Sequence, residues 1–355
     1  MAFTYKGEQF YLNGSPFTVR AGAIHYFRVP RAYWQDRLRK LKECGFNTVE
    51  TYVPWNYCEQ KEGRFDFSGE KDVATFLRTA QQLDLYAIVR PGPFICAEWE
   101  AGGLPAFLAA DADMRLRCDC DAYMQKVERY LQRLFAELRP CLLDNGGNIL
   151  MMQVENEYGS YGNDKAYLNR LVDIYRACGI TCVLFTADGV CRNMVVSGSL
   201  PERCLPFLTF GSHTVQAMQS IEFAAKNTPK MCAEFWCGWF DHWGETHHTR
   251  STEEMLVDFE PFLRHNWNFN FYMFHGGTNF GFTNGANYEN GKYMPTVTSY
   301  DYGAPLNEAG DRTETYYKLR ETIAKYGVPV PELTARESKK AAYGTVELKE
   351  CAYLF

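Results

Sequence analysis

The sequence alternates between two kinds of hydrophobic pattern. The first is a run of apolar, β-branched and aromatic residues with almost no polar interruption, which is typical of strands covered on both faces of a parallel sheet. Eight such runs predict strands at Val19–Phe27, Asn47–Trp55, Tyr86–Phe94, Ile149–Glu157, Cys182–Ala187, Phe207–His213, Met231–Trp236 and Asn268–His275.

Stretches with helical periodicity lie between these runs. Their apolar residues recur every three or four positions, which predicts amphipathic helices that each bury one side. The expected helices cover Arg31–Cys44, Asp72–Leu83, Asp121–Leu138, Lys165–Cys178, Ser251–Asn266 and Thr313–Tyr326. The helical pattern is weak after the fifth expected strand, and we expect irregular structure there.

Strands that alternate with helices in this way predict an α/β protein with a (β/α)8 or TIM barrel. We assign residues 1–327 to the barrel and residues 328–355 to a linker and a short β-rich tail. The linker is predicted because proline favours extended backbone in the sequence Val328–Pro331. We expect the tail from Glu337 onward to form one or two strands, which either cover the barrel or lead into a further domain.

Composition restricts the class of protein. Hydrophobic residues make up 46% of the chain, which is typical of globular proteins and excludes a disordered one. The net charge is -6 and no dense basic cluster is present, so we expect no nucleic-acid partner. No apolar run reaches the roughly 18 residues of a membrane-spanning helix, and we expect no membrane partner.

The N-terminal residues and the cysteines bear on localisation. The first residues lack the basic and apolar regions of a signal peptide. The cysteines number 13, an odd count, and they are scattered through expected strands and helices rather than arranged as a disulfide framework. Buried thiols fit a reducing compartment, so we expect a cytoplasmic protein. A secreted mature form, from which a signal has been removed, stays open.

Polar and aromatic residues gather at the ends of the expected strands, where a (β/α)8 barrel carries its catalytic groups. These residues are Tyr52–Trp55, Ala97–Trp99, Asn156–Tyr158, Asp188, His213, Glu234 and His275–Asn279. Three of them, Glu98, Glu157 and Glu234, are glutamates next to apolar neighbours. A buried charge in such a place is costly unless it is paired or functional. A pair of carboxyl groups is also the minimal equipment for cleaving a glycosidic bond.

Pattern alone does not separate Glu155 from Glu157, because both lie on the same face of a strand that continues to position 157. Glu157 is closer to the turn at Tyr158-Gly159 and is the better candidate for the mouth of the barrel. Glu155 is better explained as a member of a buried ion pair with an arginine.

Several tryptophans, among them Trp236 and Trp239, lie beside charged residues and glycines. An aromatic face next to hydrogen-bonding groups is what a sugar ring requires. A loop with Asp241, His242 and two further histidines has no recognised zinc spacing, so we expect no metal site and no cofactor.

Seven segments resemble the glycoside hydrolase family 35 β-galactosidases, and they occur in the family's order across roughly residues 5–325. They are Gly22–Pro30, Asn47–Trp55, Arg90–Pro105, Gln153–Tyr161, Glu234–Gly244, Tyr272–Phe282 and Thr298–Leu306. The resemblance implies a retaining, exo-acting β-galactosidase whose substrate is a small-molecule or oligosaccharide β-galactoside. It also implies that the barrel leads into C-terminal β-sandwich domains, which we expect to lie outside these 355 residues.

The resemblance carries roles onto matching residues. Glu157 matches the family's acid/base and Glu234 its nucleophile, at the ends of the fourth and seventh barrel strands. The implied substrate-binding residues are Tyr52, Ala97, Glu98, Asn156, Tyr300 and Tyr302, to which the aromatic argument adds Trp236.

Departures from the family pattern at Tyr57–Gln60, Phe94 and Gly303 concern the rim of the site and therefore the linkage preference. Two rival functions remain open. One is a β-glycosidase of another specificity, a β-glucosaminidase or a β-glucosidase, because a fold does not fix a substrate. The other is a galactose-binding protein with impaired catalysis. The natural substrate, pH optimum and oligomeric state are not predicted.

Overall fold

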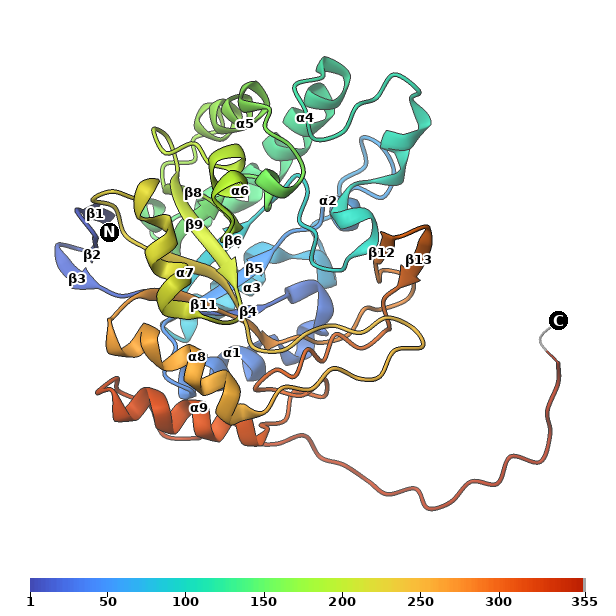
Figure 1. Ribbon diagram of the computed structural model, residues 1–355. Helices are drawn as coiled ribbons and strands as arrows, with labels where there is room; N and C mark the ends of the chain where they lie inside the picture. Colours follow the sequence, from blue (N-terminus) through green and yellow to red (C-terminus); the bar gives the residue numbers. More distant parts are fainter. Residues whose placement is uncertain (354–355) are drawn as a thin grey trace.

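A closed barrel of eight parallel strands forms the centre of the computed structural model, which describes residues 1–353 (Figure 1). The strands are β4 (Arg20–Ile24), β5 (Thr48–Tyr52), β6 (Tyr86–Arg90), β7 (Ile149–Gln153), β8 (Val183–Gly189), β9 (Leu205–Phe210), β10 (Met231–Trp236) and β11 (Asn268–His275). They follow one another around the barrel in sequence order, and β11 closes it against β4. The predicted (β/α)8 barrel is confirmed.

Helices surround this barrel, as Figure 1 shows. They are α1 (Trp34–Glu43), α2 (Trp55–Cys58), α3 (Val73–Gln82), α4 (Asp121–Leu138), α5 (Lys165–Ala177), α6 (Arg192–Gly198), α7 (Thr214–Ser220), α8 (Thr252–Arg264) and α9 (Glu314–Lys325). The six predicted helices are confirmed, α4 with the predicted bounds and the other five with slightly shorter ones. The expectation of irregular structure after the fifth strand is wrong, because the seven-residue helix α6 follows β8.

A small antiparallel sheet that the hydrophobic pattern did not indicate covers the amino-terminal end of the barrel. Its strands are β1 (Phe3–Lys6), β2 (Gln9–Leu12) and β3 (Ser15–Phe17). Phe10 of β2 is fully buried and belongs to the same apolar cluster as Val19, Ile88 and Met151 of the barrel. This sheet closes the amino-terminal end of the barrel, and the carboxyl-terminal end stays open.

Several strands end earlier than predicted. β6 stops at Arg90 and β7 at Gln153, whereas the apolar pattern continues to Phe94 and Glu157. Beyond β7 the backbone enters the left-handed region, which side chains other than glycine rarely adopt, with φ of 62° at Glu155 and 44° at Glu157. The apolar residues past the strand ends thus belong to tight loops at the barrel mouth rather than to the sheet.

The chain after α9 contains no helix or strand up to residue 353, so the strands expected from Glu337 onward are absent from the described residues. The division at residue 327 stays a prediction. A strand needs a neighbour for its backbone hydrogen bonds, and this extended segment runs away from the barrel in Figure 1. The expected tail also included residues 354 and 355, which lie outside the described residues. No helix within residues 1–353 is long and apolar enough to cross a membrane.

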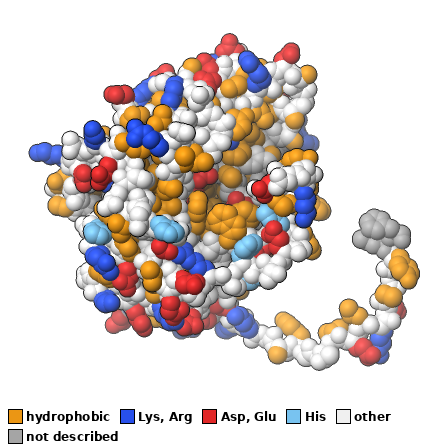
Figure 2. Space-filling view, viewed as in Figure 1, with side chains coloured by type: hydrophobic (Ala, Val, Ile, Leu, Met, Phe, Trp, Pro, Cys, Tyr) orange, Lys and Arg blue, Asp and Glu red, His pale blue; other side chains and the backbone are white. Residues whose placement is uncertain are grey.

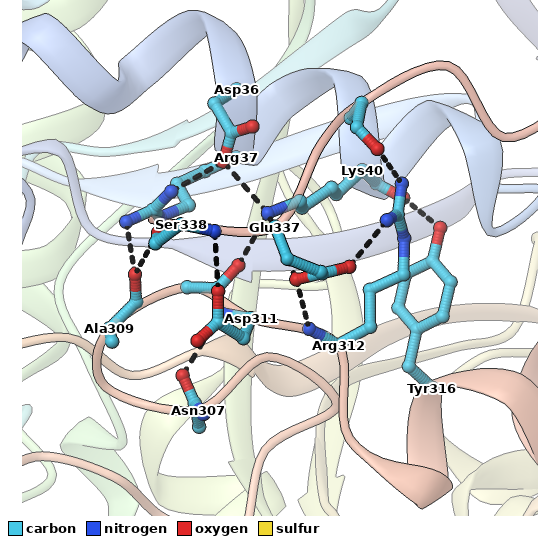
Figure 3. A network of polar contacts seen from close by, with 12 residues as sticks. Asp36, Arg37, Lys40, Asn307, Ala309, Asp311, Arg312, Tyr316, Glu337 and Ser338 are labelled. Carbon is cyan, nitrogen blue, oxygen red and sulfur yellow. Dashed lines mark hydrogen bonds and ion pairs between the residues drawn. The ribbon is translucent and has the colours of Figure 1, made fainter. Parts of the chain in front are cut away.

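The first part of this C-terminal segment is held against α1 and the loop before α9 (Figure 3). Arg312 donates to Glu43 of α1 and to Glu337 of the segment, each over 2.6 Å. The backbone N–H of Ser338 donates to Asp311 over 2.9 Å. The Arg312 and Glu43 side chains are 4% and 3% exposed, so their ion pair is buried.

Candidate active site

A cavity of about 210 Å³ opens at the carboxyl ends of the barrel strands. Eight of the nine predicted site residues line it, namely Tyr52, Ala97, Glu98, Asn156, Glu157, Glu234, Trp236 and Tyr302. The ninth, Tyr300, lies behind this wall, and its hydroxyl donates to the Glu98 carboxylate. Residues more than 200 positions apart in sequence therefore meet in one place.

Glu234, on β10, is surrounded by hydrogen-bond donors. Its Oε1 accepts from the Tyr52 hydroxyl and from Nη1 of Arg90, each over 2.6 Å. Its Oε2 accepts from the indole N–H of Trp236 over 3.0 Å. The carboxylate thus has three donors, one of them a guanidinium that stays charged, and this environment suits a negative charge.

Glu157 has a different environment in the same cavity. Its Oε1 accepts one hydrogen bond, from the Thr209 hydroxyl of β9 over 2.7 Å. Removal from bulk water raises the pKa of Glu157, and the negative charge of Glu234 raises it further, to about 7. Glu157 can therefore hold a proton near neutral pH, whereas the three donors around Glu234 stabilise a negative charge on that side chain.

Arg90 connects these groups, and the sequence analysis did not single it out. It ends β6 with its side chain 1% exposed, and its Nη2 donates to Oδ1 of Asn156 over 2.8 Å. The Tyr52 hydroxyl oxygen, whose proton is donated to Glu234, lies 2.8 Å from the same Asn156 oxygen. The strand-end rule that identified the glutamates missed Arg90, because the predicted strand ran on to Phe94 and placed Arg90 in its middle.

The opposite wall contains tyrosines and a second buried arginine. The hydroxyls of Tyr272 and Tyr300 lie 3.1 Å apart, and the guanidinium of Arg28 lies 3.8 Å from the centre of the Tyr300 ring. Nη2 of Arg28 donates to the Ala97 carbonyl over 2.5 Å. Burial raises the pKa of Glu98 on this wall. Tyr272 was missed because it lies inside an unbroken apolar run, where pattern gives no reason to choose it.

Glu155 points away from this cavity. Both of its oxygens accept from Arg117 over 2.8 Å, and the Tyr167 hydroxyl donates to Oε1 over 3.0 Å. The predicted buried ion pair is confirmed. The prediction that Glu155 and Glu157 share a strand face is wrong, because β7 ends at Gln153 and the chain turns before either glutamate.

The histidine loop behind β10 makes polar contacts of its own. The Asp241 carboxylate bonds the ring nitrogens of His247 and His248 at 2.6 and 2.8 Å. His242 bonds Asn287, which lines the cavity, at 2.9 Å. Within residues 1–353, no group of three or more His, Cys, Asp or Glu is placed to hold a metal ion.

The family model described as "Glycosyl hydrolases family 35" matches residues 9–326. The chain belongs to this family. A relative, "Beta-galactosidase" from Xanthomonas manihotis, is 43% identical over 338 residues, which cover 94% of this chain and 56% of the relative. "Beta-galactosidase" from Canis lupus familiaris is 44% identical over 351 residues, 98% of this chain and 52% of that protein. The chain thus spans about half the length of the curated relatives it matches.

Solved structures of low sequence identity share the fold of this family 35 chain. "GH5_18 from Streptomyces cattleya in complex with GlcNAc" has a TM-score of 0.59 and 13% identity, and the match covers 88% of this chain and 82% of that one. "Exo-beta-1,4-mannosidase Op5Man5 from Opitutaceae bacterium strain TAV5" has a TM-score of 0.59 and 12% identity, over 89% of this chain and 60% of that one. At such identities the likeness concerns the barrel alone.

Proposed function

We propose that this chain is the catalytic part of a retaining, exo-acting β-galactosidase. It removes terminal non-reducing β-D-galactose from β-galactosides through a covalent galactosyl-enzyme intermediate. The observation that carries the proposal is the pair of unlike carboxyl groups in one cavity. Glu234 is surrounded by three donors, and the pKa of Glu157 is raised to about 7. The similarity to β-galactosidases supports the choice of sugar.

In the first step, Glu234 attacks the anomeric carbon while Glu157 donates its proton to the leaving oxygen. Bond formation removes the negative charge of Glu234, which was one cause of the raised pKa of Glu157. Glu157 then loses its proton more readily and acts as the base that activates water for the second step. One side chain serves as acid and then as base because its neighbour's charge changes between the steps.

The remaining cavity residues would hold the sugar. A volume of about 210 Å³ fits a single terminal ring better than the interior of a polysaccharide chain, which supports exo action. Asn156, Tyr52 and the Ala97–Glu98 segment present polar atoms to the ring hydroxyls. Tyr302 and Trp236 supply aromatic surface for its apolar face. Arg90 keeps Glu234 oriented and balances its charge.

Hydrolysis of a nitrophenyl β-galactoside followed by proton NMR tests the reaction and its stereochemistry together. We expect β-galactose to appear first and to mutarotate later, and the galactoside to be cleaved faster than the matching glucoside and N-acetylglucosaminide. Glu234→Gln should abolish turnover. Glu157→Gln should retain the first step with a good leaving group such as dinitrophenolate. Initial formation of α-galactose, or substantial turnover by Glu234→Gln, would contradict the proposal.

A further inference from the structure

A second and much larger cavity, of about 910 Å³, lies beside the proposed catalytic site. It is formed where β8, β9 and β10 end and where α6 and α7 begin. Apolar side chains make up much of its wall, among them Val190, Met194, Phe210 and Ala217. Figure 2, in the same view as Figure 1, shows hydrophobic side chains gathered near the middle of this face. The proposed mechanism places no part of the substrate in this larger cavity.

The two cavities share part of their walls. Trp236 and Trp239 line both, and Trp239 is 40% exposed, so its ring is available to a ligand. Thr209, whose hydroxyl donates to Glu157, also lines the larger cavity. The larger cavity therefore adjoins the sugar site on the side of Glu157.

That side is the one from which the aglycone must leave. The general acid of a glycosidase donates its proton to the leaving oxygen, so the aglycone lies on the side of the acid. The opposite end of the sugar site is formed by other loops. Glu98 lies in the loop after β6, and Tyr300 and Tyr302 lie in the loop after β11, away from the ends of β8 and β9. These residues would hold the non-reducing end of the sugar. A galactoside placed in this direction projects its aglycone toward Thr209 and the larger cavity.

The chemistry of the lining selects among aglycones. No acidic residue lines this cavity in the described part of the chain. Its arginine, Arg250, is already engaged, because Nη2 donates to Asp258 over 2.6 Å and Nη1 to the Gly211 carbonyl over 2.8 Å. Ser212, His213, Gln216 and Ser220 add polar groups at the rim, but most of the exposed wall is apolar and aromatic. Such a wall suits an apolar ligand, and the volume is within the usual range for small-molecule sites.

We infer that the cavity between α6 and α7 is an aglycone pocket that selects β-galactosides with an apolar aglycone, an alkyl chain or an aryl group. The inference rests on the proposed function, because the direction of the aglycone follows from the role of Glu157. Burial of the aglycone against Met194, Phe210 and Ala217 stabilises the bound substrate and its transition state. Each additional buried methylene is expected to raise kcat/KM roughly fourfold.

Alkyl β-D-galactosides of increasing chain length, from methyl to octyl and below their micelle concentrations, test the pocket. We expect octyl β-galactoside to exceed methyl β-galactoside at least tenfold in kcat/KM. It should also exceed lactose, whose aglycone is a polar sugar. Equal values for methyl and octyl, or a preference for lactose over octyl β-galactoside, would overturn the inference. The occupant of the cavity would then be a polar sugar or a segment of protein, and not an apolar aglycone.

Two exposed valines provide matched variants. Val190 lines the pocket and is 44% exposed, whereas Val196, on α6, does not line it and is 53% exposed. Val190→Glu places a charge against the aglycone and should lower the octyl-to-methyl ratio of kcat/KM at least fivefold. Val196→Glu should keep that ratio within twofold. The same loss in both variants would mean that charge or stability, not the pocket, controls the ratio, and would count against the inference.

Binding of thioglycosides separates failure of the pocket from failure of the proposed reaction. Octyl and methyl 1-thio-β-D-galactosides resist hydrolysis, so calorimetry measures their affinities whether or not the chain is active. At least tenfold tighter binding of the octyl compound supports the pocket, and equal affinities reject it. Absence of hydrolysis with every oxygen-linked galactoside would instead reject the proposed function.

Discussion

The hydrogen bond from Thr209 to Glu157 gives a sharp prediction about pH dependence. The Thr209 hydroxyl donates to the ionised carboxylate over 2.7 Å, and this bond lowers the pKa of Glu157 against the larger raising effects of burial and of Glu234. Thr209→Val removes the donor and keeps the shape of the side chain. The pKa of Glu157, about 7 in the unchanged chain, should therefore rise.

The size of this change follows from the strength of the bond. A hydrogen bond to a charged group contributes about 1.5–3 kcal/mol, and one pKa unit corresponds to about 1.4 kcal/mol. Water at the cavity replaces part of the lost bond, so we expect an increase of about one unit. Glu157 must be protonated to act as the acid, and activity falls as pH rises through its pKa. The alkaline limb of the kcat/KM profile should therefore move to higher pH.

The assay is the pH profile of kcat/KM for methyl β-galactoside, whose leaving group needs a proton. Thr209→Ser keeps the hydroxyl and serves as the control, with an alkaline limb close to that of the unchanged chain. An alkaline limb that stays in place in Thr209→Val, or that moves to lower pH, would refute the assignment of this limb to Glu157.

Three further predictions concern buried charges. Arg90→Met removes a guanidinium that donates to Glu234, and kcat/KM for a nitrophenyl β-galactoside should fall about 100-fold; a change below threefold would contradict its role. Burial raises the pKa of Glu50 to about 7, so the free energy of unfolding should fall as pH rises from 5 to 8. Glutamine at position 50 does not ionise, so the free energy of unfolding of Glu50→Gln, measured in urea, should increase relative to that of the unchanged chain by about 2–3 kcal/mol between pH 5 and pH 8. A difference between the two chains that does not change with pH would exclude the raised pKa of Glu50. Arg312→Met leaves buried Glu43 without its guanidinium and should lower the free energy of unfolding by about 3 kcal/mol. Lys318→Ala removes only exposed ion pairs and should change the free energy of unfolding far less; similar losses in both variants would contradict this.

Much of the barrel was predictable because its strands are covered on both faces and are therefore apolar along their whole length. The antiparallel sheet β1–β3 was not, since its strands are short and largely exposed and leave little hydrophobic signal. Strand ends were placed too late at β6 and β7. The residues beyond them are also buried, and burial rather than strand geometry determines the hydrophobic pattern.

The candidate site likewise contains residues that the sequence pattern identified and residues that it did not. Glu98, Glu157 and Glu234 were identified because a carboxylate among apolar residues is conspicuous. Thr209 gave no signal, since a threonine in a strand is ordinary. Its importance comes from a hydroxyl on β9 that reaches Glu157, in the loop after β7, past the intervening strand β8. The different protonation of the two acids also depends on Arg90, which lies next to Glu234 only in the folded barrel.

The most direct test of the account is to trap the covalent intermediate with 2-deoxy-2-fluoro-β-D-galactosyl fluoride and to locate the label by peptide mass spectrometry. The account predicts one fluorogalactosyl group per chain, attached to Glu234 in the peptide Met231–Trp236 or a longer fragment that contains it. A label on Glu157 or on Glu98, or inactivation without any covalent label, would contradict it.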